Sequence, residues 1–189
     1  MAEVVGAPEI TRCEEEIASE LAGVSAPLRS VFVALDLAVA RAPGPGDLVC
    51  GQGADELFLG YAHFRGLAAA PARQRAHDDL DRLLREDWPR TERLAVRRGR
   101  TVRAPYLSEA FVTAALRVPV ERRLPSPIPK AFFRDFAVAR GLPLEIAARP
   151  KRAMQFGSGI DRVRRQSAFG RRPGGDFPPT VDRGGSRVI

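Results

Sequence analysis

The sequence predicts a mostly helical fold that contains little strand. Most segments repeat apolar residues at helical spacing and are bounded by proline or glycine. Residues 47–50 have the length and composition of a short buried strand. The chain has 189 residues, of which 44% are apolar, and this is enough for one domain with a hydrophobic core.

Composition sets the class of protein before any motif is considered. No apolar run approaches the length that spans a membrane, and acidic residues, among them Glu3 and Glu9, occupy the place of a signal peptide's basic and apolar regions. We therefore expect a cytoplasmic protein without membrane contact. Cys13 and Cys50 form neither a disulfide framework nor a cluster of metal ligands.

The net charge of +7 is concentrated toward the C-terminus. From Asp161 onward, seven arginines face three acids and are interleaved with glycine and proline. We divide the chain into a folded part, 1–160, and a basic flexible tail, 161–189. Such a tail can contact RNA, but no helix-turn-helix, zinc-finger or RNA-binding motif accompanies it, so nucleic acid is not the expected partner.

Two helices are expected before the strand and three between the strand and residue 100. Thr11, with Glu14 three residues later, has the spacing of a capping box for the first helix. Pro89 is predicted to separate the helix at 71–87 from the helix at 91–98. The leucines that form the inner face of the helix at 71–87 include Leu84. The expected helices cover residues 9–22, 27–42, 54–67, 71–87 and 91–98.

The second half is predicted to contain two longer helices and a short one. Ser108 caps the first of them, with Leu116 among the residues that face inward. Lys130 opens the second, which Gly141 closes. One further turn is expected at 144–148.

The stretch from Val49 to Tyr61, VCGQGADELFLGY, is the strongest candidate site. Gly51 and Gly53 permit a tight turn and the close approach of a ligand to the main chain. A helix beginning at Ala54 would present unpaired N–H groups to an anion, and Asp55 could hold the accompanying cation. An ordinary strand-to-helix corner with an acidic first turn explains the same residues.

Arginine is the default basic residue of this chain. Of the 30 basic residues, only Lys130 and Lys151 are lysines. A lysine in such a setting is expected where a compact, rotatable ammonium is needed in place of a planar guanidinium. Chance retention is the alternative for either residue.

Four motifs in this order resemble the C-terminal synthetase domain of asparagine synthetase and its relatives, the beta-lactam synthetase type included. They are G-x-G-A-D-E-L-F-x-G-Y, V-R-x-P-[FY]-L, K-x-x-x-R and R-x-K-x-x-x-Q-F-x-x-G, and they carry both lysines. The resemblance covers about residues 48–160. It implies a mostly α structure derived from the α/β adenine-nucleotide alpha-hydrolase-like synthetase domain, a helical bundle that retains one or two short parallel strands.

The resemblance further implies an ATP-dependent ligase that uses Mg²⁺, activates a carboxylate as an acyl-adenylate and then forms an amide. Lys151 matches a lysine that stabilises the charged transition state, and Gln52 lies in the loop beside the adenylate. A cation held by Asp55 and the ammonium of Lys151 would stabilise charge on the phosphates. The positions that match cofactor-binding residues are Gly51, Gly53, Asp55, Glu56, Arg103 and Lys130, of which Asp55 matches a magnesium ligand.

Three positions depart from the family pattern. Gln52 stands where the family carries an acid, Cys50 where it carries serine, and Ser108 where it carries aspartate. An amide cannot act as a base at neutral pH. Either Gln52 only positions a substrate, or the acid chemistry has moved or been lost.

The sequence also lacks the S-G-G-x-D-S loop with which the family grips pyrophosphate, and Ala2 stands where a glutaminase domain would place its cysteine. We therefore expect the distal part of a synthetase domain, with an exposed apolar surface. A protein partner that supplies the missing loop, or a homo-oligomer, would cover that surface.

Three functions remain open from the sequence. The first is a partial or split subunit of an amide ligase that acts on a small-molecule carboxylate. The second is a non-catalytic remnant, or a binding module of the same fold. The third is a basic adaptor that contacts RNA through the arginine-rich tail.

Overall fold

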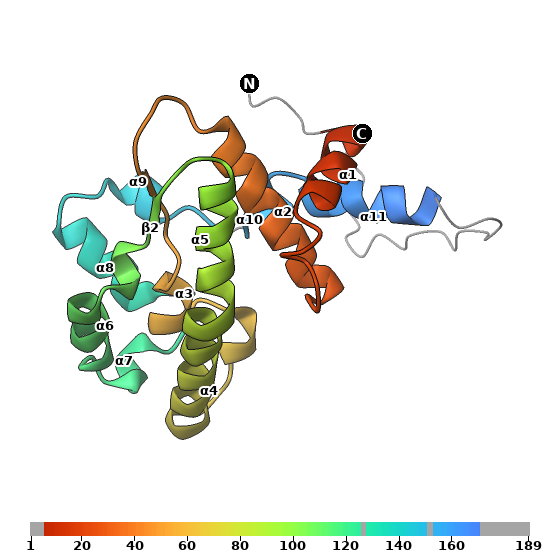
Figure 1. Cartoon of the computed structure of the whole chain (residues 1–189). Coiled ribbons are helices and arrows are strands. Elements are labelled where there is room, and N and C mark those ends of the chain that lie inside the picture. Colours follow the sequence, from red (N-terminus) through yellow and green to blue (C-terminus); the bar gives the residue numbers. More distant parts are fainter. Residues whose placement is uncertain (1–5, 126–127, 151–152, 171–189) are drawn as a thin grey trace, which may run out of the picture.

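The computed structural model describes residues 6–125, 128–150 and 153–170. Most of them are helical, and the strands among them are β1 (Leu48–Val49) and β2 (Val102–Arg103), which pair in parallel (Figure 1). The predicted fold class is confirmed: a helical assembly with two short parallel strands. Within the described ranges, no helix is long and apolar enough to cross a membrane.

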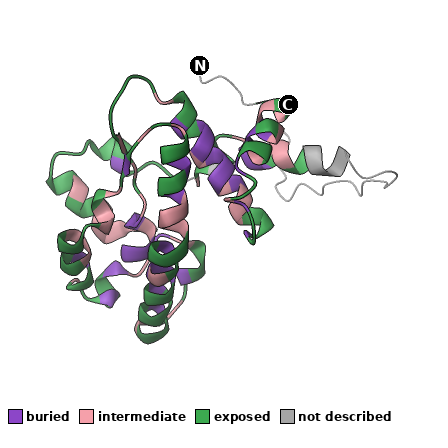
Figure 2. Ribbon diagram, in the orientation of Figure 1, coloured by how far each residue is buried: buried purple, intermediate pink, exposed green. Residues whose placement is uncertain are grey.

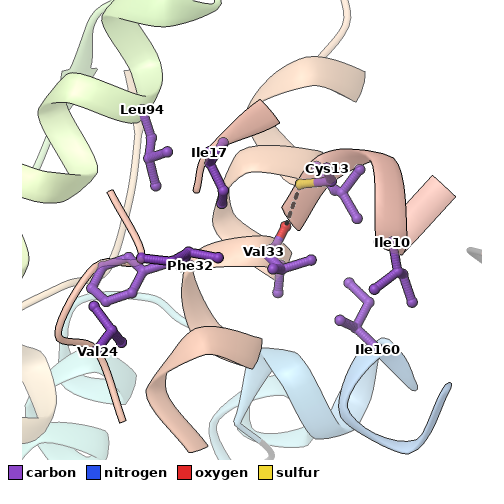
Figure 3. Packing of buried hydrophobic residues seen from close by; sticks show 11 residues of the cluster. Ile10, Cys13, Ile17, Val24, Phe32, Val33, Leu94 and Ile160 are labelled. Carbon is purple, nitrogen blue, oxygen red and sulfur yellow. Dashed lines mark hydrogen bonds between the residues drawn. The ribbon is translucent and has the colours of Figure 1, made fainter. Parts of the chain in front are cut away.

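The largest core cluster forms where four helices meet. Helix α2 (Ala26–Arg41) contacts α1 (Ala7–Glu16), α5 (Trp88–Arg97) and α11 (Ile160–Gly170). These helices cover the apolar faces of α2. Its buried side chains meet those of the other three helices, among them Ile10, Ile17, Phe32, Val33, Leu94 and Ile160 (Figure 3).

Helix α1 differs from its predicted form at both ends. It begins at Ala7, with Gly6 as N-cap and Pro8 in the first turn, so Thr11 lies inside the helix and does not cap it. Proline favours the first helical turn because its φ is preset and its missing N–H has no partner there. The α-helix ends at Glu16, and residues 17–23 continue as turns.

The helix predicted over 54–67 is wrong. Helix α3 (Ala54–Leu57) is a single turn, and the 3-10 helix η1 (Ala62–Phe64) follows it. Between them Leu59 adopts a φ of 52°, a left-handed conformation that interrupts a helix. Four residues of this stretch, Leu57, Phe58, Tyr61 and Phe64, are expected from their helical spacing to face the core; three of them are buried, and Tyr61 is half-buried.

Pro89 does not break the long central helix. Helix α4 (Ala69–Arg82) continues through a π-helical turn, η2 (Leu83–Asp87), directly into α5, where Pro89 lies in the first turn. A π turn changes the phase of the helix surface. Leu83 stays buried, whereas Leu84, predicted to face inward, is 42% exposed.

The second half supplies a layer of short helices around an aromatic cluster. Phe58 stacks on Phe133 at 4.4 Å between ring centroids, and Phe111 meets Phe58 edge-on. Leu116, predicted to face inward, is 52% exposed. The elements are η3 (Pro105–Leu107), α6 (Glu109–Leu116), α7 (Val120–Arg123), α8 (Ala131–Ala139), α9 (Leu144–Ala147) and α10 (Met154–Gly157).

Helix α11 runs through the predicted boundary at residue 161. Ser30 on α2 donates a hydrogen bond to Asp161 at 2.9 Å, and both residues are buried. Arg164 pairs with Glu14 on α1. Residues 171–189, the rest of the predicted tail, lie outside the described residues.

Large apolar side chains are exposed along α8, α9 and the turn between them. Much of this part of the molecule is exposed in Figure 2. The exposed apolar residues here are Phe136, Val138, Leu142, Leu144 and Ile146. Val49, on β1, is 72% exposed, so the strand is present as predicted but it is not buried.

Candidate functional site

The first motif lines a cavity of about 480 Å³. Gly51, Gln52, Gly53, Asp55 and Glu56 all contribute to its wall. Helix α2, the α4–η2 segment and α10 form the remaining sides. The structure therefore brings five of the predicted site residues together at one place.

The two glycines of the loop differ in why they are glycine. Gly53 has a φ of 95°, and a Cβ there would lie 2.5 Å from Cδ2 of Leu107. At Gly51 a Cβ would meet Tyr106 at 4.0 Å, an ordinary contact. Gly53 is thus required by the packing of the loop on η3, whereas Gly51 is not required sterically.

Gln52 anchors the loop to the central helix. Its Nε2 donates to Oγ1 of Thr91 at 3.2 Å, and its Oε1 accepts from Sγ of Cys50 at 3.7 Å. The Thr91 hydroxyl in turn donates to the carbonyl of Asp87 at 2.9 Å. Burial raises the pKa of the Cys50 thiol, which keeps it protonated as a donor. Sequence reasoning missed Thr91, because a threonine inside a helix gives no signal of such a contact.

Asp55 is held by Lys130. The lysine Nζ lies 3.0 Å from Oδ1 of Asp55, and the same oxygen lies 1.9 Å from where a Cβ on Gly60 would be. Lys130 is the N-cap of α8 and has a φ of 59°, a left-handed conformation that costs a non-glycine residue roughly 1 kcal/mol. The structure therefore places the Lys130 ammonium on the candidate metal ligand.

Glu56 is a buried carboxyl group with a hydroxyl partner. It is 5% exposed, and the Tyr61 hydroxyl donates to its Oε1 at 2.5 Å. Burial raises the pKa of Glu56, against the opposite effect of the Tyr61 bond. Burial likewise raises the pKa of the Tyr61 hydroxyl, so it remains a donor.

Two further carboxylates, which sequence reasoning did not identify, face the cavity from the central helix. Asp79 pairs with His63 at 2.8 Å and with Arg75 at 3.3 Å. Asp87 lies 3.7 Å from Arg82, and its pKa is raised by burial and lowered in part by that arginine. The acidic wall is thus balanced by cations from the same helix.

The described residues supply one carboxylate suited to a magnesium ion. Within those ranges no group of three or more His, Cys, Asp or Glu side chains is arranged to hold a metal. Magnesium is usually held by one or two protein carboxylates together with nucleotide phosphates and water. Asp55 fits that role as a single ligand, beside an anion that brings the remaining oxygens.

Arg103 and Lys130 are predicted site residues that the structure describes but that do not line the cavity, although Lys130 contacts Asp55 on its wall. The Arg103 side chain is 68% exposed and its Nε lies 2.5 Å from Asp47, so its predicted cofactor contact stays a prediction. Lys151 lies outside the described residues. Ala153 and Met154, which follow it in the sequence, do line the cavity.

Comparison with known proteins gives one consistent family. A sequence model of the asparagine synthase family matches residues 66–169. The glutamine-hydrolyzing asparagine synthetases of Homo sapiens and Rattus norvegicus are each 37% identical over 120 residues, which is 60% of this chain and 20% of theirs. That of Gallus gallus is 36% identical over 121 residues. The chain spans about a fifth of the length of these relatives.

Proposed function

Because the chain belongs to the asparagine synthase family, we propose that its cavity forms one wall of the site at which an ATP-dependent amide ligase activates a carboxylate. The observation that carries this proposal is the position of the first motif, which lines a cavity of about 480 Å³ with Asp55 on its wall. A cavity of that size suits a small-molecule ligand.

The proposed reaction has two steps. A substrate carboxylate oxygen attacks the α-phosphate of ATP, the bond to the β-phosphate breaks, and pyrophosphate leaves. An amine or ammonia then attacks the acyl carbon of the acyl-adenylate, and AMP and a proton are released. Asp55 would hold a magnesium ion that supplies positive charge beside the phosphates, and Lys151 would add its ammonium.

We propose that Gln52 positions the loop and does not transfer a proton. Both ends of its amide are engaged, one by Thr91 and the other by Cys50. An amide also has no basic form at neutral pH. These contacts support a role in anchoring the loop, which differs from the substrate-positioning role that the sequence left open for this residue.

The proposal includes a partner that supplies the S-G-G-x-D-S loop. The printed sequence does not contain that loop. The exposed apolar residues of α8, α9 and the turn between them give a surface on which a partner could dock. A homo-oligomer that covers the same residues is the alternative occupant.

The test is reconstitution with a polypeptide that carries S-G-G-x-D-S. We expect carboxylate-dependent release of pyrophosphate when both chains and ATP are present, and little or none with either chain alone. Lys151→Arg should abolish the release and leave folding intact. Arg12→Lys, an exposed change on α1, is the matched control.

Two results would count against this function. Undiminished pyrophosphate release by Lys151→Arg would reduce that lysine to a packing residue. No release with any tested carboxylate, despite formation of the two-chain complex, would contradict the ligase itself.

A non-catalytic binding module is the second candidate, and the engagement of Gln52 at both ends of its amide favours it. Under this hypothesis the acid chemistry has been lost and the fold retained. Calorimetric titration of the isolated chain with a non-hydrolysable acyl-adenylate analogue tests it. Tight binding of this analogue by the chain alone would count against a non-catalytic remnant of a ligase.

A further inference from the structure

We propose that Lys130 and Arg134, one helical turn apart at the start of α8, form a clamp that positions two separate parts of the site. Lys130 holds the carboxylate of Asp55. Arg134 holds main-chain carbonyls at Ala147 and Arg149. We call these two residues the α8 clamp. It rests on the proposed function only for the chemistry that it would support.

The first end of the clamp encloses the Asp55 side chain. Oδ1 of Asp55 lies 3.0 Å from the Lys130 ammonium and occupies the space that a side chain at position 60 would need. The Gly60 N–H donates to the Asp55 carbonyl at 2.8 Å, so the loop closes on itself at this point. Glycine at 60 and lysine at 130 together leave the carboxylate little freedom to rotate.

The backbone at Lys130 supports a role for its side chain. Among the described residues, the non-glycine residues with positive φ are Leu59, which precedes Gly60, and Lys130, whose side chain lies against Asp55 and Gly60. A glycine would adopt the left-handed conformation at position 130 without strain. A strained backbone that clusters at one site is the pattern expected where side-chain geometry is required.

The second end of the clamp uses the planar fork of arginine. Nη1 of Arg134 donates to the carbonyl of Arg149 at 2.9 Å and also to that of Ala147. Its Nε donates to the Pro129 carbonyl at 3.1 Å, which fixes the residue that precedes Lys130. A guanidinium can donate to several carbonyl groups at once because its N–H groups point in fixed, different directions, which the compact ammonium of lysine cannot reproduce.

One turn of α8 thereby links two motifs that are far apart in the sequence. The motif K-x-x-x-R is explained by its geometry, since the lysine reaches the Asp55 loop and the arginine reaches the segment that leads to Pro150. Both act as positioning residues. In this proposal Lys130 orients Asp55 toward the cavity, and its predicted role in binding a cofactor stays a prediction.

Hydrogen–deuterium exchange of the full chain measures amide exchange rates near each end of the clamp separately. Lys130→Gly keeps the left-handed backbone without strain, and we expect exchange at residues 55–60 to rise about tenfold. Arg134→Met should raise exchange at residues 147–149 by a similar factor. Arg140→Met, on the same helix with its guanidinium over Phe136, is the control and should change neither region. Unchanged exchange at either variant's own end overturns the clamp.

Manganese binding in the presence of ATP, followed by electron paramagnetic resonance, distinguishes positioning from simple packing. Loss of a residue that orients a metal ligand typically weakens metal affinity by about tenfold or more, and we expect that loss for Lys130→Gly. Asp55→Asn gives the baseline. Tighter or equal manganese binding by Lys130→Gly would show that the ammonium competes with the cation, which overturns its positioning role. If the wild-type chain alone binds no manganese, the metal site requires the partner that supplies the S-G-G-x-D-S loop, and the exchange experiment alone decides the clamp.

Discussion

At the scale of single residues, the site loop depends on contacts that a side chain would destroy. Gly53 combines a φ of 95° with the close approach of Leu107, and both effects oppose any larger residue. A strained left-handed backbone costs about 1 kcal/mol, and forcing extra volume into a packed contact costs about 1–3 kcal/mol. Gly51, two residues earlier, has neither constraint.

The two glycines therefore predict different outcomes for the same substitution. Gly53→Ala should lower the free energy of unfolding by about 2–4 kcal/mol in urea titrations. Gly51→Ala should change it by less than about 0.5 kcal/mol. Equal losses in the two variants would show that Leu107 does not pack against the loop.

Glu56 gives a pH dependence whose sign follows from its burial. Burial raises the pKa of its carboxyl group above the ordinary value of 4.5. As the pH rises past that value, the unfolded chain releases this proton before the folded chain does, so the folded state loses stability. Glu56→Gln removes the titration and keeps an acceptor for the Tyr61 hydroxyl.

We expect Glu56→Gln to gain stability over the wild type as the pH rises from about 4.5 to 7, with no gain below that range. Urea unfolding at several pH values measures the difference. Glu92→Gln, an exposed change on α5, is the control. A gain that is largest at acid pH would contradict the buried, raised-pKa carboxyl group.

At the scale of secondary structure elements, one of the two predicted helix caps is present in the structure and the other is not. Ser108 accepts a hydrogen bond from the N–H of Phe111 at 3.4 Å, as predicted, whereas Thr11 lies inside α1. Ser108→Ala should cost about 1 kcal/mol of unfolding free energy, and Thr11→Ala less than about 0.5 kcal/mol. Thermal and urea unfolding of both variants checks this, and a larger loss at Thr11 would be the contrary result.

The sequence predicts those elements that are determined by neighbouring residues, and it fails for those that are determined by contacts with residues far away in the chain. The bounds of α2, the strand before the loop and the cap at Ser108 follow from proline, glycine and apolar spacing, which are local signals. The end of α3 does not, because it coincides with a left-handed backbone at Leu59 and an ion pair between Asp55 and the distant Lys130, neither of which has a local signal in the sequence. The π turn before Pro89 is likewise a tertiary effect, and it reversed the orientation predicted for Leu84.

The candidate site shows the same contrast between features with a local sequence signal and features that depend on contacts between distant residues. Motif order predicted which loop would line a cavity, and five residues of that loop do so. The partners of those residues could not be predicted, because Thr91 and Lys130 come from elements distant in the sequence. Sequence also gave no warning that Arg103 would pair with Asp47 away from the cavity.

At the scale of the whole molecule, one buried charge pair joins α2 to the central helix. Asp36 is fully buried, and Arg98 donates to both of its oxygens, at 3.1 Å and 2.5 Å. The Cys13 thiol also donates to Asp36 at 3.3 Å, and burial raises the pKa of that thiol. A carboxylate in this position is stable only while its partners remain.

Removing the cation from this pair should therefore destabilise the chain strongly. Arg98→Met leaves a buried carboxylate uncompensated, with an expected loss of about 3–5 kcal/mol in the free energy of unfolding. Arg97→Met, at the neighbouring exposed position, is the control. Combining Arg98→Met with Asp36→Leu should recover part of the loss, and a double variant as unstable as the sum of the two would contradict the coupling.

The hydrogen bond between Ser30 and Asp161 joins residues that are separated by 131 positions, and Ile160 completes the cluster built by α1 and α2. Such a contact cannot form during synthesis until the ribosome has released residue 160. The middle of the chain has clusters of its own, around Phe64 and around Phe58, and these can assemble earlier. Helices α1 and α2 are made before those clusters, but the cluster that they share with Ile160 is completed after them, so part of their apolar surface stays open to chaperones or to misassociation until α11 has emerged.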